Sequence, residues 1–266
     1  MVNIIGVMLN KGGVGKSSLV TNLGALLADK GYKTLLIDTD SQGNTPLSFG
    51  RNPETLEHTL YDVLMGNLDP EKALLNINDN LDILPSNSDS DLFELDFYSE
   101  WDRETNPFTL LKVKLHNLVN KYDFIIIDTP PAFTTLTTNA LILSDFIVIP
   151  FEPDLYSSKG LVRLVKSVDK FKETYNPDLS ILGVVPMKID YRTNIHKEGV
   201  AQASRYLDSK GLKMFNTSIN RSIVFSDSVF YSSKPAVWNE PNHVAVLKYK
   251  ELLEEILEEI DKNREG

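Results

Sequence analysis

The sequence predicts an α/β fold with a mostly parallel, twisted sheet and helices on both faces. Short apolar runs at 4–9, 34–37 and 124–127 are typical of strands covered on both sides. Segments with helical spacing of apolar residues alternate with these runs, which is the order of βαβ units. A glycine-rich loop joins the first run to the first helical segment. With 42% hydrophobic residues the chain can bury one substantial core, so we expect a single domain over 1–266.

The first loop, N-K-G-G-V-G-K-S-S over residues 10–18, has the composition of a phosphate-binding loop. Its glycines let the backbone curl with N–H groups inward, and the helix that follows presents its positive dipole end. Lys16 and Ser17 stand where a β- or γ-phosphate and Mg²⁺ would be met, so a nucleoside triphosphate is the implied ligand. The expected nucleotide-binding residues of the loop are Lys11, Gly12, Gly13, Val14, Gly15, Lys16, Ser17 and Ser18.

Two residues of this loop depart from the ordinary G-x-x-x-x-G-K-[ST] pattern. Asn10 stands where the first glycine belongs, and Asn is the next best residue for a left-handed turn. Lys11 is a second lysine that the loop does not need for cradling phosphates. This K-G-G-x-G-K-[ST] form resembles the deviant Walker A loop of the ParA/MinD family of ATPases. The resemblance implies an ATP-bound sandwich homodimer in which Lys11 reaches the partner's nucleotide, so that Lys11 and Lys16 both serve catalysis.

The segment after the second apolar run carries two acids. A helix from Ser17, ended by Gly31, leads to a strand at 34–37, and D-T-D-S-Q-G-N follows at 38–44. This is the carboxyl edge where open α/β sheets bind ligands. The segment resembles the family's first switch, D-x-D-P-Q-x-N, with serine in place of proline. The resemblance implies that Asp40 positions or activates the attacking water and that Asp38 supports the Mg²⁺ shell. An Asx-rich turn with helix-capping duties is the alternative.

The run F-I-I-I-D-T-P-P at 124–131 is predicted to be a Walker B strand followed by a turn. Its acid, Asp128, is expected to reach Mg²⁺ through water, as in P-loop enzymes generally. The D-T-P-P ending resembles the second switch of the same family. Upstream, 45–80 is expected to be helical and irregular, 81–84 to be the third strand, and the acidic segment 86–105 to be an exposed connection carrying a helix.

The last third of the chain is predicted to contain strands at 146–150 and 181–185 and a helix at 159–172. By resemblance, F-E-P-D at 151–154 belongs to the family's dimer face, and Met187 and Asn220 lie against adenine. The C-terminal segment from Val246 has apolar residues on one face and many acids elsewhere, so it is expected to pack on the domain. It is too acidic to be a basic helix that lies on anionic lipid.

Charge is uneven along the chain. Lys and Arg total 27 against 37 Asp and Glu, giving a formal charge of −10, but 188–221 holds seven bases and three acids. Its S-I-N-R-S-I-V run resembles the family's I-P-R-N-V-R run, with Val224 where the second arginine would be. The resemblance implies non-specific duplex DNA binding, and ordinary surface bases are the alternative. The expected DNA-binding residues are Arg192, Lys197, Arg221 and Lys234. Because Arg221 is far in sequence from the loop and switches, we expect it to be separate from hydrolysis.

Other features narrow the function. The absence of cysteine excludes thiolate zinc and iron–sulfur sites. The first strand begins by Asn3, leaving no room for a signal peptide or an N-terminal DNA-reading module, and no apolar run approaches the ~20 residues of a membrane span. We therefore expect a cytoplasmic protein, and the resemblance implies that it associates with the nucleoid.

The resemblance implies a DNA-partitioning ATPase with ATP and Mg²⁺ as cofactors. Its slow hydrolysis would be stimulated by a small basic ParB-like centromere-binding partner, without stable membrane binding. One alternative is a MinD-like membrane-cycling ATPase, which the acidic C-terminal segment disfavours. Another is a metabolic P-loop enzyme such as an amide-forming ligase, which Lys11 disfavours.

Overall fold

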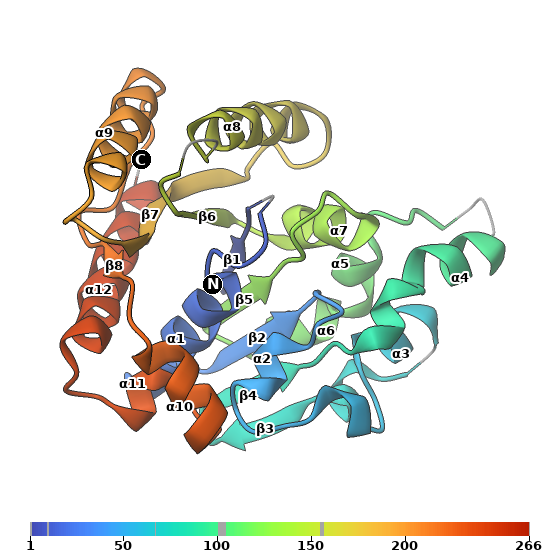
Figure 1. The fold of residues 1–266 in the computed structure, drawn as a ribbon. Helices are drawn as coiled ribbons and strands as arrows, with labels where there is room; N and C mark the ends of the chain where they lie inside the picture. The colour runs from blue at the N-terminus through green and yellow to red at the C-terminus, as the bar shows by residue number, and fades with distance from the viewer. Residues whose placement is uncertain (1, 10, 67, 101–104, 155–156, 266) are drawn as a thin grey trace.

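The computed structural model describes residues 2–9, 11–66, 68–100, 105–154 and 157–265. Within them, one sheet has the strand order β3-β4-β2-β5-β1-β6-β7-β8 (Figure 1). Neighbouring strands are parallel except for the antiparallel pair β3 and β4. The strands are β1 (Asn3–Val7), β2 (Thr34–Asp38), β3 (Leu75–Asn78), β4 (Leu81–Leu84), β5 (Phe124–Asp128), β6 (Phe146–Phe151), β7 (Ser180–Ile189) and β8 (Ile219–Asn220).

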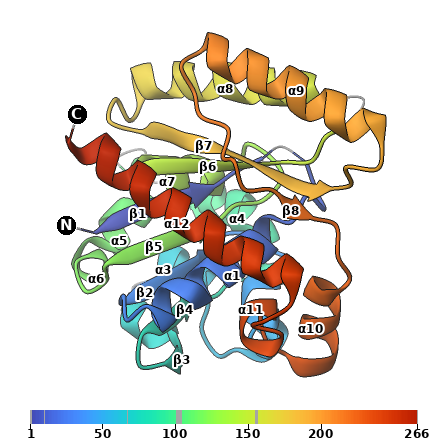
Figure 2. The same ribbon diagram turned by 90° about the vertical axis from the view of Figure 1, so that its left-hand side faces the viewer.

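Helices cover both faces of this sheet, as the sequence predicts (Figures 1 and 2). They are α1 (Lys16–Asp29), α2 (Asn44–Leu47), α3 (Leu60–Met65), α4 (Phe93–Glu100), α5 (Leu110–Lys114), α6 (His116–Val119), α7 (Thr135–Leu143), α8 (Ser157–Thr174), α9 (Asn194–Ser209), α10 (Val224–Ser232), α11 (Ala236–Asn239) and α12 (Val244–Glu265). Short 3-10 turns lie at Pro53–Thr55, Pro70–Ala73 and Ser88–Asp91.

The core has two parts, one on each face of the sheet. Successive residues of a strand point to opposite faces, and on β5 this places Ile126 with the cluster around α1, α8 and α12, whereas Ile125 and Ile127 join the cluster around α3, α5 and α7. Both faces of the central strands are therefore buried, which explains why these strands are continuous apolar runs and do not alternate with polar residues.

Most predicted elements are present, with two corrections. The prediction for 45–80 missed β3, so 81–84 is the fourth strand and not the third. The sequence of β3, L-N-I-N, is half-exposed at the sheet edge and lacks a continuous apolar run. The acidic segment 86–105 does carry a helix, but it is not simply an exposed connection, because Phe93 and Phe97 of α4 are buried. Residues 101–104 of that prediction lie outside the described residues.

The C-terminal helix packs on the domain as expected. α12 lies beside α1 across one face of the sheet (Figure 2), and its apolar residues Tyr249, Leu253, Ile256 and Ile260 are buried there. The face that a lipid-binding helix would need is therefore occupied by the core. Within the described ranges, no helix combines the length and apolar character needed to span a bilayer.

Shortening one buried side chain of α12 should measure this packing. We expect Ile256→Val to lower the free energy of unfolding by about 0.5–1.5 kcal/mol, the usual cost of removing a buried methylene group. Glu258→Gln, on the exposed side of the same helix, is the control and should change it by less than about 0.5 kcal/mol. Urea unfolding followed by circular dichroism provides the measurement. Equal stabilities of both variants and the wild type would mean that α12 does not belong to the core in solution.

Candidate nucleotide-binding site

The loop between β1 and α1 is shaped by two glycines with left-handed backbones. Gly13 has φ of +74° and Gly15 has φ of +101°, angles that L side chains rarely adopt. Gly15 directly precedes α1, whose first turn has no capping side chain and no acid. The free N–H groups of that turn can therefore receive an anion. Asn10 lies outside the described residues, so its predicted turn stays a prediction.

Lys16 is buried inside this loop. Its Nζ donates to the carbonyl oxygens of Leu9 at 3.4 Å and Lys11 at 3.2 Å. Burial lowers the pKa of Lys16, and the carboxylates of Asp128 and Asp40 oppose that shift. A buried ammonium whose hydrogen-bond acceptors among the described residues are carbonyl oxygens is well placed to gain from an anionic ligand such as a phosphate.

Two acids lie side by side at the ends of neighbouring strands. Asp38 of β2 and Asp128 of β5 are paired in the sheet register, and both are fully buried. Burial and the nearby carboxylate of Asp128 raise the pKa of Asp38 well above its usual value. Burial raises the pKa of Asp128 to about 6, while hydrogen bonding from Ser17 and the charge of Lys16 act in the opposite direction. Two buried carboxylates so close together would be stabilised by a cation.

The two acids use their oxygen atoms differently. Asp38 accepts backbone N–H groups on both oxygens, from Asp40 at 3.0 Å and Thr45 at 3.0 Å, so it fixes the segment after β2. Asp128 Oδ2 accepts the hydroxyl of Thr45 at 3.2 Å. Its Oδ1 is buried and has no hydrogen-bond partner among the described residues. Asp128 thus holds the free oxygen, and the role of Asp38 in a metal shell stays a prediction.

These residues fit Mg²⁺. The ion prefers oxygen ligands, keeps several waters and is held by few protein groups together with substrate phosphates. The hydroxyl of Ser17 and the unpartnered oxygen of Asp128 are such groups, the latter through a water. In the described part of the chain, His, Cys, Asp and Glu nowhere form a group of three able to hold a metal alone. Phosphate oxygens of a bound nucleotide would complete the coordination of the ion.

A cleft of about 1330 Å³ opens above the loop. Its lining includes the predicted residues Gly12, Gly13, Gly15, Lys16, Ser17, Ser18, Asp40, Met187 and Asn220. The fold thus brings the two expected adenine contacts to the loop and the first switch. In sequence, more than 140 residues separate these contacts from the loop and the switch. Val14 is buried and does not border the cleft, and Lys11, Asp38 and Asp128 lie outside its lining.

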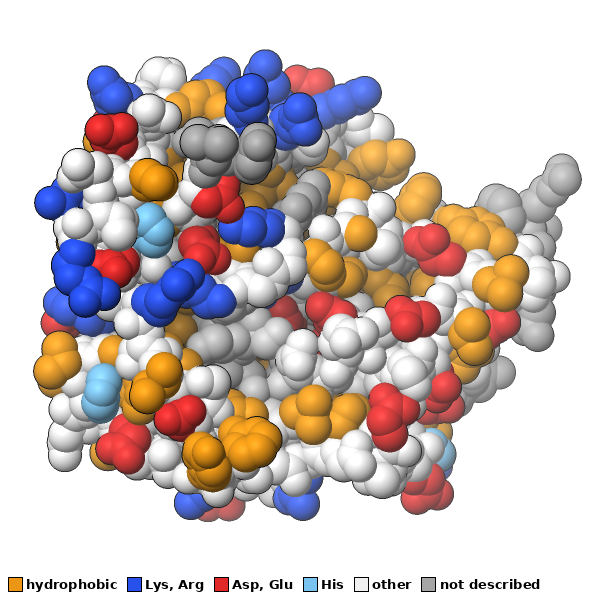
Figure 3. Space-filling model, viewed as in Figure 1, with side chains coloured by type: hydrophobic (Ala, Val, Ile, Leu, Met, Phe, Trp, Pro, Cys, Tyr) orange, Lys and Arg blue, Asp and Glu red, His pale blue; other side chains and the backbone are white. Residues whose placement is uncertain are grey.

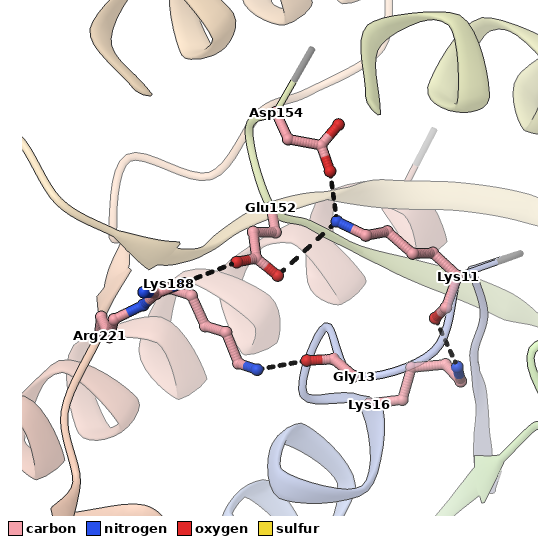
Figure 4. A network of polar contacts seen from close by, with 7 residues as sticks. All are labelled: Lys11, Gly13, Lys16, Glu152, Asp154, Lys188 and Arg221. Carbon is pink, nitrogen blue, oxygen red and sulfur yellow. Dashed lines mark hydrogen bonds and ion pairs between the residues drawn. The ribbon is translucent and has the colours of Figure 1, made fainter. Parts of the chain in front are cut away.

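Lys11 points away from its own phosphate loop, as Figure 4 shows. Its Nζ lies 2.5 Å from Asp154 Oδ2 and 3.8 Å from Glu152 Oε2. Both acids belong to the segment after β6 that the sequence places on a dimer face. The two lysines of the loop are therefore divided, with Lys16 directed into the loop and Lys11 directed to the acids that follow β6.

Arg221 does not lie apart from the nucleotide site, although it is far in sequence from the loop and switches. The expectation that hydrolysis does not depend on it stays a prediction. Arg221 borders the same cleft, and its Nη2 lies 3.3 Å from Oε1 of Glu152, the acid that also contacts Lys11. β8 ends at Asn220 and places Arg221 next to the parallel strand β7, whose end also borders the cleft. Distance in sequence was a poor guide here because parallel strands bring their carboxyl ends to one edge of the sheet.

Of the other predicted DNA contacts, Arg192 lies near Arg221, whereas Lys197 and Lys234 lie on other segments. Arg192 and Arg221 border a smaller cavity of about 460 Å³, and the guanidinium of Arg192 binds both oxygens of Asp190, at 2.8 and 2.7 Å. Lys197 is exposed in the first turn of α9, and Lys234 is exposed between α10 and α11. In Figure 3 basic side chains gather over α8 and α9, whereas acidic and apolar ones gather over α4.

Sequence reasoning missed two cations of the cleft, Arg51 and Lys188. Lys188, near the end of β7, borders the cleft and donates a hydrogen bond to the carbonyl oxygen of Gly13. A lysine inside the otherwise apolar stretch 181–189 is the sequence feature that would have drawn attention to it.

Comparison with known proteins agrees with this geometry. The sequence model of a family described as "AAA domain" matches residues 2–181. The chain is 33% identical to a ParA family protein of Mycoplasma pneumoniae, covering 96% of this chain and 97% of that protein. It is also 33% identical to the sporulation initiation inhibitor protein Soj of Bacillus subtilis, covering 96% and 98%.

A solved structure shares the fold as well. Cobyrinic acid a,c-diamide synthase of Mycobacterium smegmatis, with a bound ATP analogue and magnesium, superposes with a TM-score of 0.82 at 26% identity, covering 96% of this chain and 93% of that one. The sequence relatives, the strand order and the second lysine of the loop all indicate the same family. The chain therefore belongs to the ParA/MinD family of P-loop ATPases and is of the ParA and Soj type.

Proposed function

We propose that this chain is an ATP-dependent DNA-partitioning ATPase. ATP with Mg²⁺ binds the cleft and drives formation of a homodimer, and the dimer binds duplex DNA without sequence preference at the nucleoid. Slow hydrolysis, stimulated by a small basic ParB-like centromere-binding protein, resets the cycle. The similarity to Soj and ParA proteins over nearly the whole chain supports this assignment.

The observation that carries the proposal is the division of labour between the two loop lysines. Lys16 lies inside the loop, so binding of the chain's own nucleotide does not need Lys11 as well. Lys11 extends instead to Glu152 and Asp154 on the surface beside the cleft. A cation held there would serve a nucleotide bound by a second copy of the chain. A metabolic enzyme that acts as a monomer has no use for such an arrangement.

The charge distribution supports a DNA contact that depends on dimerisation. Arg192 is paired with Asp190 and Arg221 with Glu152, so a single subunit does not offer these two arginines as free positive charges. With a formal charge of −10, the monomer should bind DNA weakly. A dimer doubles the number of these basic residues. If Lys11 leaves Glu152 for a partner's nucleotide, the charges around Glu152 and Arg221 change as well. The acidity of the chain also suits a basic partner protein.

DNA binding across a salt series tests the function. We expect two unrelated duplexes to bind equally with ATP and weakly with ADP or without nucleotide. Lys197→Ala should reduce the slope of log K against log salt by about 1.8, because one phosphate contact per subunit contributes about 0.9. Lys197 is preferable to Arg221 for this purpose, since Arg221 borders the nucleotide cleft.

Lys210→Ala is the matched control. Lys210 is also exposed, but it lies at the opposite end of α9 from Lys197, and its removal should leave the slope unchanged. Binding that ignores nucleotide, or equal slopes for Lys197→Ala and wild type, would place the DNA surface elsewhere. A complete absence of DNA binding would favour a synthase-like or membrane-cycling function.

A further inference from the structure

Lys188 sits in an unusual backbone conformation at the edge of the cleft. Its φ is +54°, and among the described residues other than glycine only Ser233 shares a positive φ. Such a conformation is uncommon for a long side chain and is strained, so it persists only where the surroundings enforce it. Strain of this kind is concentrated at functional sites.

The strain coincides with a β-bulge. Met187 pairs with Ile219 and Ile189 pairs with Asn220, so two steps along β7 match one step along β8 and Lys188 is the extra residue. Met187 and Ile189 are both buried, whereas Lys188 is only half-buried and borders the cleft. The bulge thus keeps its neighbours in the core and turns Lys188 toward the phosphate loop, a common use of bulges beside active sites.

The side chain of Lys188 reaches the top of that loop. Figure 4 shows it extending to Gly13, where Nζ donates to the carbonyl oxygen. No carboxylate of the described residues forms an ion pair with Lys188, in contrast to Lys11 and Arg221 nearby. Lys188 therefore adds an uncompensated positive charge to the cleft.

The contact has a direct consequence for phosphate binding. The carbonyl of Gly13 and the N–H of Val14 belong to one planar peptide group and point in opposite directions. An ammonium on the oxygen holds that plane and polarises the group, which makes the N–H a stronger donor. The N–H of this peptide therefore points away from Lys188, and inward-facing backbone N–H groups are what a phosphate-binding loop offers to its ligand.

We infer that Lys188 is a positioning residue for the nucleotide's phosphates, because it fixes the Gly13–Val14 peptide from outside the loop while Lys16 acts from inside. The inference rests on the proposed binding of ATP and deepens it. From the sequence, the end of β7 is expected to contact only the adenine. The inference gives it a second role, in recognising di- and triphosphates.

Binding of ATP, ADP and adenosine by the full-length chain with Mg²⁺ tests this role. Lys188→Met keeps the length of the side chain and removes its charge. We expect it to weaken ATP and ADP by about tenfold, the size of one charge-assisted hydrogen bond, and to leave adenosine unchanged. Lys188→Arg should restore most of the affinity, and Lys210→Met should bind all three ligands like wild type.

Lys188→Gly separates charge from strain. Glycine accepts a positive φ, so this variant should be at least as stable as wild type in urea, and yet it should bind ATP as weakly as Lys188→Met. Unchanged ATP affinity in Lys188→Met, equal losses for adenosine and ATP, or no rescue by arginine would overturn the inference. If wild type binds ATP tightly and Lys188→Met does too, only this inference fails. If wild type binds neither ATP nor ADP, the proposed function fails with it.

Discussion

Asp40→Ala should bind ATP like wild type, lose at least about a hundredfold of its turnover, and accumulate as an ATP-bound dimer. Asp40 borders the cleft just after β2, and its Oδ1 accepts the backbone N–H of Gln42 at 3.1 Å, which holds the carboxylate in place. The groups expected to hold the phosphates and Mg²⁺ are others, namely Lys16, Ser17, Asp128 and the loop N–H groups. Removing Asp40 should therefore affect hydrolysis without affecting binding.

Phosphate release and size-exclusion chromatography with light scattering measure the two halves of this prediction. Ser41→Ala is the matched control. Ser41 is the residue after Asp40 and borders the same cleft, but it has no expected role in hydrolysis. Its turnover should stay within a few-fold of wild type. An Asp40→Ala variant that hydrolyses ATP normally, or that remains monomeric with ATP, would remove Asp40 from the catalytic role.

The sequence predicts those parts of the site that come from short continuous segments of the chain. The loop at 11–18 and the acids at the ends of β2 and β5 each follow directly from an apolar strand, and parallel strands place their carboxyl ends at one edge of the sheet. Their approximate position therefore follows from the order of elements alone. The half-exposed edge strand β3 carries no such pattern, and this is why it was missed.

The contacts that sequence could not predict depend on side-chain direction and register. The bulge that turns Lys188 toward Gly13 arises from the pairing of β7 with β8, which a single sequence does not reveal. The sharing of Glu152 between Lys11 and Arg221 joins three segments that are distant in sequence. Arg221 was assigned to DNA alone for this reason, although the structure also places it beside the nucleotide cleft.

Lys11→Ala should lose ATP-dependent dimerisation and nearly all turnover, and mixing variants should show whose nucleotide Lys11 serves. In the structure Lys11 contacts Asp154 and Glu152, but Lys11 and Asp154 are each about 40% exposed, so breaking the pair costs only about 0–1 kcal/mol. Lys11 is thus free to move to a ligand across an interface. If it acts there, each complete site needs Lys11 from one subunit and Asp40 from the other.

A mixture of Lys11→Ala with Asp40→Ala subunits, combined before ATP is added, therefore distinguishes the two arrangements. In trans, each mixed dimer keeps one complete site, so turnover should return. A quarter of the wild-type value, the result of random pairing, is about the upper limit, because Asp40→Ala subunits also pair stably with one another. In cis, neither subunit has both groups and no activity returns. Lys16→Ala mixed with Asp40→Ala is the matched control and should stay inactive, because Lys16 is enclosed by its own loop. Recovery in the control as well would mean that the subunits do not form the composite sites assumed here, and the role of Lys11 in a sandwich dimer would have to be abandoned.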